Sequence, residues 1–236
     1  MPSLHATATS ATRGTVNVAV LSMLVGKGLG YKEENLIDLA KGALVHDIGI
    51  LAAIPEEILQ KKENLTGEEI KKYKEHAEIG YKLIRKMRNI SIMSAHIAYQ
   101  HHERYDGSGY PRELKKEKIT EYGYIVGLTN KYDNFVNGIK TESRITATAA
   151  REYLLMAQDN LFPENIVKNF LDKVPAYPNG STILLSDKSV AVVIKQNNDN
   201  LSRPFIRVIE KDGKSLEKGI DIDLMEHHSL LPEKSL

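Results

Sequence analysis

The sequence contains no cysteine and no tryptophan, and neither sign of charge dominates it. The lack of cysteine excludes disulfide bonds, thiolate metal sites, iron–sulfur clusters and cysteine nucleophiles. With 32 Lys and Arg residues against 31 Asp and Glu residues, the charge balance argues against a nucleic-acid coat or a membrane-surface patch, and we expect no DNA partner. The eight histidines are therefore the natural candidates for soft metal ligands.

Long apolar runs are also missing. The longest, residues 16–25, is interrupted by Asn17 and Ser22, whereas a membrane span needs about 20 apolar residues. Residues 1–13 are rich in Ser, Thr and Ala, but a single Arg is too little basic charge for a transit peptide. We therefore expect a cytoplasmic protein with a frayed or truncated N-terminal segment at residues 1–14 and no membrane segment.

Hydrophobic periodicity predicts that residues 15–174 form an all-α body. In the first predicted helix the apolar residues that recur at helical spacing are Val16, Val20, Met23 and Leu24. The second has an apolar side made of Leu36, Ile37, Ala40, Ala43 and Leu44. Thr66, followed three residues later by Glu69, has the pattern of a capping box, which predicts a long helix from there to about residue 87.

The periodicity changes in the last quarter of the chain. Residues 181–185, 190–194 and 204–209 are short, rich in Val and Ile, and separated by Asp, Asn, Lys and Gly. This pattern predicts three or four strands in an antiparallel meander. We therefore expect a mainly α protein, with a helical domain at residues 15–174 and a small β appendage at residues 175–236.

Histidines and carboxylates gather in the helical part in a pattern that suits a metal site. Its candidate ligands, in chain order, are His46, Asp47, His76, His101 and His102. Imidazole nitrogens together with carboxylate oxygens suit a divalent cation of hard or borderline character. Adjacent residues on a helix point about 100° apart, so each pair suits either a helix end or two adjacent ions, and each pair precedes a glycine-containing turn. The remaining histidines singled out here, which we interpret as structural or surface residues, are His5, His96, His227 and His228.

Several of these segments resemble one known family. The run His46-Asp47-Ile48-Gly49 looks like the HD signature, and the block around His76 is similar to the next block of HD-GYP domains. Residues 101–111, HHERYDGSGYP, match the HHExxDGSGYP segment of that family almost letter for letter. Residues 177–181 resemble the segment that follows many HD-GYP domains. The resemblance covers roughly residues 14–230 and identifies the chain as a divergent member.

The resemblance implies a fold, an activity and a ligand set. HD-GYP proteins are helical, metal-dependent bacterial phosphodiesterases that hydrolyse cyclic di-GMP to the linear dinucleotide or to GMP, with two or three ions that are often iron or manganese. Asp47 would bridge the ions as the catalytic residue, and His46 would hold the first ion. The second ion would be held by His76, His101 and His102.

The resemblance also implies how substrate and partners are bound. Gly109, Tyr110 and Pro111 would form the loop beside the substrate phosphate, and this Gly-Tyr-Pro loop would also contact signalling proteins. A further substrate contact is implied for Arg144. The family pattern there is Arg-x-x-Lys/Arg. In this chain Ala147 stands at the position of the second basic residue. The resemblance also allows a homodimer.

Four further positions depart from the family pattern. Gly14 stands where the family has an early histidine, and Ser10 stands where three-metal members have a glutamate. The HD signature ends in Ile50 instead of lysine. Asn130 replaces an aspartate ligand, so it offers a neutral carbonyl oxygen to the metal in place of a charged one.

These departures predict a weakened first-metal site. We expect one well-bound ion, a second that is weak or absent, and weak or no hydrolysis, because two ions together clamp the attacking and leaving oxygens. One alternative is an active phosphodiesterase with altered substrate or a one-metal mechanism. Others are an inactive cyclic di-GMP sensor or protein-interaction module, and an effector domain whose site has no ligand left.

Overall fold

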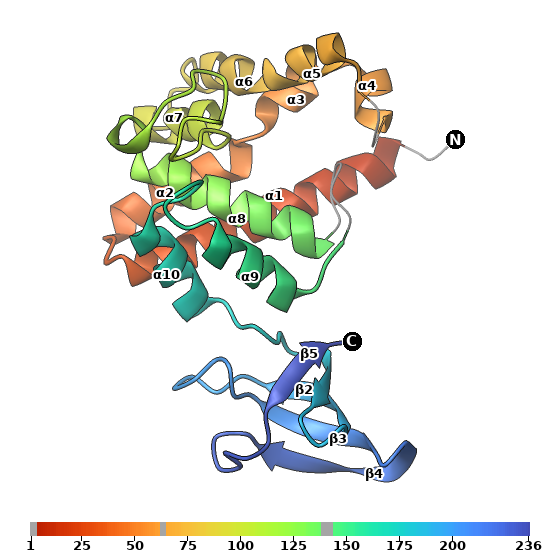
Figure 1. Ribbon diagram of the computed structural model, residues 1–236. Coiled ribbons are helices and arrows are strands. Elements are labelled where there is room, and N and C mark those ends of the chain that lie inside the picture. Colours follow the sequence, from red (N-terminus) through yellow and green to blue (C-terminus); the bar gives the residue numbers. More distant parts are fainter. Residues whose placement is uncertain (1–3, 62–64, 138–143) are drawn as a thin grey trace. The chain divides into compact units, whose positions relative to one another are not determined.

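The computed structural model describes the backbone of residues 4–61, 65–137 and 144–236 (Figure 1). Within these residues, α-helices fill the first three quarters of the chain and five strands follow. The mainly α fold with a C-terminal antiparallel sheet is confirmed. The chain divides into two compact units: residues 1–144 with 154–170, and residues 145–153 with 171–236. The predicted boundary between residues 174 and 175 stays a prediction.

The helices of the chain have the following bounds: α1 (Leu4–Gly28), α2 (Glu33–Val45), α3 (Ile48–Ala53), α4 (Glu56–Gln60), α5 (Gly67–Lys74), α6 (His76–Ile84), α7 (Ile92–Gln100), the 3-10 helix η1 (Lys116–Lys118), α8 (Glu121–Asn137), α9 (Ala147–Met156) and α10 (Glu164–Lys173). No helix among the described residues is both long enough and apolar enough to span a membrane. Long apolar side chains such as Phe162, Phe170 and Leu39 are fully buried in the helical unit.

The outer face of α1 carries the bulky residues that the periodicity singled out. Val16, Val20, Met23 and Leu24 are all at least 40% exposed. The buried side of α1 instead presents small residues such as Ala19 and Ser22, and the Ser22 hydroxyl lies 2.9 Å from the Thr129 hydroxyl of α8. Val18 and Val25 are buried as well, so the buried side of α1 differs from the one that the periodicity indicated.

The helix predicted from Thr66 onward is two helices in the structure. Its capping box is confirmed: Glu69 N donates to the Thr66 hydroxyl, and Thr66 N donates to a Glu69 carboxylate oxygen at 2.9 Å. However, α5 ends at Lys74 and α6 begins at His76, so the prediction of one unbroken helix to residue 87 is wrong. The break falls at Glu75, and His76 becomes the first residue of α6.

Two glycines set the spacing of the helices around His46, His76 and His101. A Cβ on Gly49 of α3 would lie 2.0 Å from the carbonyl oxygen of His76, and one on Gly127 of α8 would lie 2.5 Å from that of His101. Real Cβ atoms cannot come so close to a carbonyl oxygen. The backbones of α3 and α6, and of α7 and α8, are therefore in direct contact.

The second unit contains one antiparallel sheet of β1 (Thr182–Leu185), β2 (Val190–Lys195), β3 (Phe205–Lys211), β4 (Lys214–Asp223) and β5 (Pro232–Ser235). Its strand order is β4-β3-β2-β1-β5. The first four strands form the predicted meander, and a fifth strand, which the sequence did not indicate, returns to pair with β1. Alternate residues of β1 to β3, including Ile183, Ala191 and Ile206, are buried in a small core.

The contact between α3 and α6 yields a stability prediction. Gly49→Ala should lower the free energy of unfolding by about 1–3 kcal/mol, because the added Cβ must push the two helices apart. Urea denaturation measures the change. Gly67→Ala is the matched control, since no atom lies within 4 Å of its added Cβ. A Gly49→Ala variant as stable as the wild type would contradict the close approach.

Candidate metal centre

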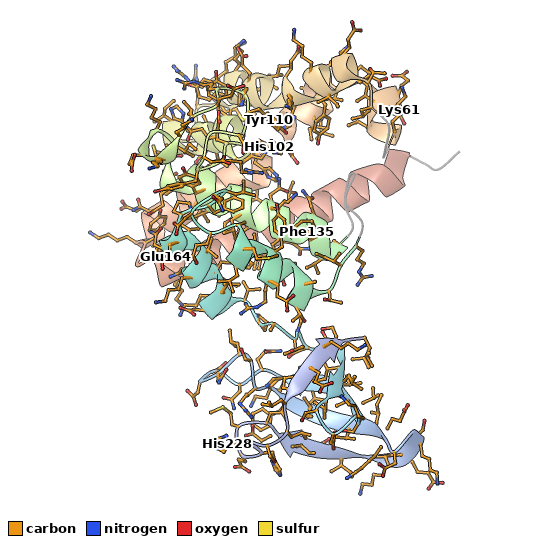
Figure 2. The ribbon with its side chains drawn as sticks, viewed as in Figure 1. Lys61, His102, Tyr110, Phe135, Glu164 and His228 are labelled. Atoms are coloured by element: carbon orange, nitrogen blue, oxygen red, sulfur yellow. The ribbon has the colours of Figure 1, made fainter. Side chains whose placement is uncertain are left out.

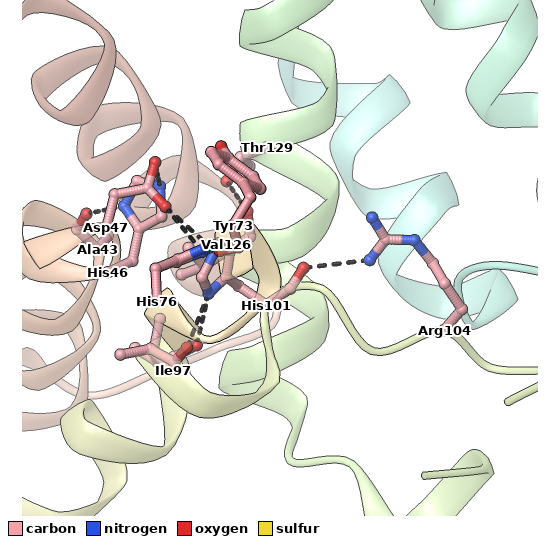
Figure 3. A network of polar contacts seen from close by, with 11 residues as sticks. Ala43, His46, Asp47, Tyr73, His76, Ile97, His101, Arg104, Val126 and Thr129 are labelled. Carbon is pink, nitrogen blue, oxygen red and sulfur yellow. Dashed lines mark hydrogen bonds and ion pairs between the residues drawn. The ribbon is translucent and has the colours of Figure 1, made fainter. Parts of the chain in front are cut away.

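Four ligand candidates come from helix ends. His46 directly follows α2, Asp47 directly precedes α3, His76 begins α6, and His101 directly follows α7. Figure 3 shows their side chains meeting in the interior of the helical unit. Helix ends, one of the two arrangements that the sequence allowed, are therefore observed for these four residues.

Backbone carbonyls orient three of the imidazole rings. In each, Nδ1 lies within hydrogen-bonding distance of a carbonyl oxygen in the last turn of a helix: His46 with Ala43 at 2.6 Å, His76 with Tyr73 at 2.6 Å, and His101 with Ile97 and Ala98 at 3.1 Å. A carbonyl oxygen can only accept, so Nδ1 carries the proton. In a neutral ring Nε2 is then a lone-pair donor, which is the arrangement of metal-binding histidines.

The three Nε2 atoms face the Asp47 carboxylate. His46 Nε2 lies 3.3 Å from Oδ2, while His76 Nε2 and His101 Nε2 lie 3.5 Å and 3.3 Å from Oδ1. All three histidines are buried. Lone pairs that face a carboxylate in the interior repel it, so the arrangement favours a cation between them. The two Asp47 oxygens face different histidines, which suits a bridging ligand.

Burial keeps one of these histidines neutral. His101 is fully buried, and desolvation lowers its pKa to about 3, although the neighbouring Asp47 carboxylate acts in the opposite direction. The imidazole is therefore unprotonated at neutral pH. This is the form that a divalent ion requires, because a protonated ring has no lone pair to offer.

His102 completes a set of four side chains. One ligand atom each from Asp47, His76, His101 and His102 lies within 4.8 Å of all the others. The His102 ring is stacked on Tyr110, with centroids 4.4 Å apart and planes 16° from parallel. Burial raises the pKa of Tyr110 well above its usual range, and the charges of Tyr73 and Asp47 add to the rise. The loop tyrosine is thus a neutral phenol beside the cluster.

The structure places the remaining sequence candidates as follows. Asn130 is 6% exposed on α8, one turn after Gly127, and Gly14 is buried in α1. Ile50 is partly buried on α3, close in sequence to Asp47. Arg144 is exposed and precedes α9, and its role as a substrate contact stays a prediction. The side chains of Ser10 and His5 lie outside the described residues.

The sequence analysis missed the residue that fixes the Gly-Tyr-Pro loop. Glu103 is 1% exposed, and its carboxylate accepts hydrogen bonds from Arg112 N at 2.8 Å and Leu114 N at 2.9 Å. Gly109 packs against the same segment, since a Cβ there would lie 2.4 Å from Glu103 Cα. The available signal was an acidic residue next to the histidine pair, but a sequence cannot show that it is buried.

A metal-binding prediction follows from the cluster. Wild-type protein desalted after incubation with Mn²⁺ should keep about one ion per chain and show a higher melting temperature, because an ion that binds only the folded state stabilises it. His101→Gln should lose both effects, and metal analysis with thermal unfolding measures them. His96→Gln, which changes a partly buried histidine of α7 outside the cluster, is the control. Equal metal content in both variants would contradict the assignment.

A loop prediction follows from Glu103. Glu103→Gln should lower the free energy of unfolding by about 1–3 kcal/mol, because one of the two backbone N–H groups loses its charged acceptor and the buried side chain loses a hydrogen bond. It should also speed cleavage of the loop by protease. Glu113→Gln alters an exposed acid of the same loop and should have neither effect. Proteolysis rates that match between the two variants would exclude an anchoring role for Glu103.

Family models and known proteins both match this chain. A family model described as an HD domain matches residues 3–165, and another described as a KOW domain associated with HD domain matches residues 182–235. The cyclic di-GMP phosphodiesterase PdeB of Borreliella burgdorferi is 30% identical over 204 residues, which cover 86% of this chain and 53% of that protein.

Two further proteins are similar to this chain. The cyclic di-GMP phosphodiesterase response regulator RpfG of Xanthomonas campestris pv. campestris is 37% identical over 149 residues, 63% of this chain and 39% of that protein. A solved structure of an HDG"Y"P protein from Bdellovibrio bacteriovorus shares the fold, with a TM-score of 0.57 and 23% identity over 69% of this chain and 51% of its own. The chain thus spans about half the length of the curated relatives it matches, or less.

Proposed function

The chain belongs to the HD domain family, in its HD-GYP group, and on this premise we propose that it binds cyclic di-GMP at a metal centre built around Asp47, with weak or no hydrolysis. The observation that carries the proposal is the convergence of three imidazole Nε2 atoms on one carboxylate. Its neutral nitrogen and anionic oxygen donors fit a divalent transition metal.

The residues present fit such an ion, and their roles can be assigned. Asp47 would be shared between two ions, with His46 on its Oδ2 side. The Oδ1 side, where the second ion would sit, carries His76 and His101, and His102 lies within the same group. A divalent ion there supplies a Lewis acid for the phosphate and lowers the pKa of a coordinated water. Iron or manganese is the proposed metal.

Negative charge is scarce at this centre, which supports the weakened-site proposal. Among the described residues, the four-ligand group contains one carboxylate, that of Asp47. Gly14 brings no ligand atom, and Asn130 brings a neutral amide. Two dications held by a single anion repel each other strongly, so one ion should bind well and the other poorly. Loss of a supporting residue alone typically costs 10–100-fold in metal affinity or activity.

The remaining residues would bind the substrate. The loop of Gly109, Tyr110 and Pro111 forms a wall beside the cluster, because the Tyr110 ring lies against His102. Tyr110, kept neutral by burial, can donate a hydrogen bond to a phosphate oxygen. Arg144 is exposed and would supply a positive charge to the dinucleotide. The same loop is our proposed contact for a signalling protein.

The test combines metal analysis with assays on cyclic di-GMP under excess Mn²⁺ or Fe²⁺. We expect fewer than two tightly bound ions per chain, measurable binding of the dinucleotide, and slow or no turnover. The variant Gly14→His with Asn130→Asp should raise turnover by at least about tenfold, because it restores a nitrogen and an anionic ligand. Two ions per chain with fast turnover would refute the weakened site.

Binding and turnover also separate the alternatives. Binding without any turnover selects a cyclic di-GMP sensor, which the single carboxylate of the cluster favours. Neither binding nor turnover would exclude cyclic di-GMP as the ligand and leave a protein-interaction module. Cyclic di-AMP, assayed in parallel, reports whether the guanine bases are recognised.

A further inference from the structure

Lys74 lies at the rim of the metal cluster. It is the last residue of α5 and is exposed, and its Nζ atom lies 5.1 Å from the centroid of the Tyr110 ring. Tyr110 in turn is stacked on His102, and Figure 2 shows these two side chains next to each other in the helical unit. The Lys74 ammonium group thus lies over the Tyr110 phenol ring, which in turn stacks on the candidate ligand His102.

The backbone ties Lys74 to this position. The carbonyl oxygen of Tyr73, the preceding residue, lies 2.6 Å from His76 Nδ1, and the rings of Tyr73 and His76 are 5.1 Å apart. In the sequence, Lys74 therefore lies between Tyr73, whose carbonyl orients the His76 ring, and His76 itself. Its side chain starts from a point that is fixed relative to the cluster.

The charge of Lys74 is not used by an ion pair within the described part of the chain, whereas Lys61 and Lys82 pair with Glu69 and Glu78. Its partner is an aromatic ring, and such a contact at an exposed site contributes only about 0.5–1 kcal/mol. A lysine near a helix C-terminus is favoured by the helix dipole, but Lys71 and Lys72 share that effect and show no contact with Tyr110.

We propose that Lys74 and the Tyr110 ring form a phosphate-binding subsite at the rim of the metal cluster, in which the Lys74 ammonium group binds a non-bridging oxygen of the substrate phosphodiester. Lysine is a common phosphate ligand that acts as a compact point charge. It would supply a positive charge near a cluster in which α3, directly after Asp47, carries the apolar Ile50. This inference rests on the proposed function.

The experiment compares Lys74→Ala with Lys71→Ala, an exposed lysine in the same last turn of α5. Binding of inorganic phosphate and of cyclic di-GMP to the full-length, Mn²⁺-loaded protein is measured by calorimetry at low and high salt. Lys74→Ala should weaken binding of both probes at least tenfold, with unchanged metal content and a reduced salt dependence. Lys71→Ala should stay within twofold of the wild type, and Lys74→Arg should keep most of the affinity.

A rescue variant sharpens the test. Ile50→Lys, added to Lys74→Ala, should recover part of the lost phosphate affinity, since it returns a cation to the edge of the same cluster. Equal affinities for Lys74→Ala and Lys71→Ala would overturn the subsite. If the wild type binds phosphate through Lys74 but does not bind cyclic di-GMP, the subsite stands and the proposed substrate fails. If the wild type binds neither probe, both proposals fail.

Discussion

The site depends on hydrogen bonds between three imidazole rings and the last carbonyl groups of three helices. The last four carbonyls of any helix lack an intrahelical partner. Here α2, α5 and α7 each offer such a carbonyl to the Nδ1 atom of a histidine that directly follows the helix or starts the next one. The same bond satisfies the helix end, fixes the tautomer and turns Nε2 toward Asp47. The same hydrogen bonds therefore stabilise the helix ends and orient the candidate ligands.

That interaction places demands on the surrounding helices. Three helix ends can meet only if their neighbours come close, and Gly49 and Gly127 provide the space next to the carbonyl groups of His76 and His101. Glu103 holds the loop in a similar way, because its buried carboxylate accepts hydrogen bonds from two backbone N–H groups of the loop. Gly49, Gly127 and Glu103 are thus packing residues that keep the ligand side chains in position.

The sequence predicted the ligands better than it predicted their setting. His46, Asp47, His76, His101 and His102 could be named as candidates because metal ligands must have particular chemistry, and the structure brings their side chains together. The break after Lys74 could not, because Glu75 is a good helix former and nothing in its residue type marks a helix end. Likewise, periodicity located α1 but not its buried side, and the short strand β5 exists only through its pairing with β1.

The helix ends also bear on how a site with one carboxylate attracts a cation. Each helix C-terminus carries a partial negative charge of about half an elementary charge, and its effect fades within the last turn. Of the three ends, those of α5 and α7 lie beside His76 and His101, whereas only the end of α2 lies beside His46. The backbone therefore favours an ion on the Oδ1 side of Asp47. On the proposed assignment, this is also the side that keeps its three histidines, so backbone and side chains would support the same ion. The proposed loss of ligands would then fall on the position that the backbone supports least.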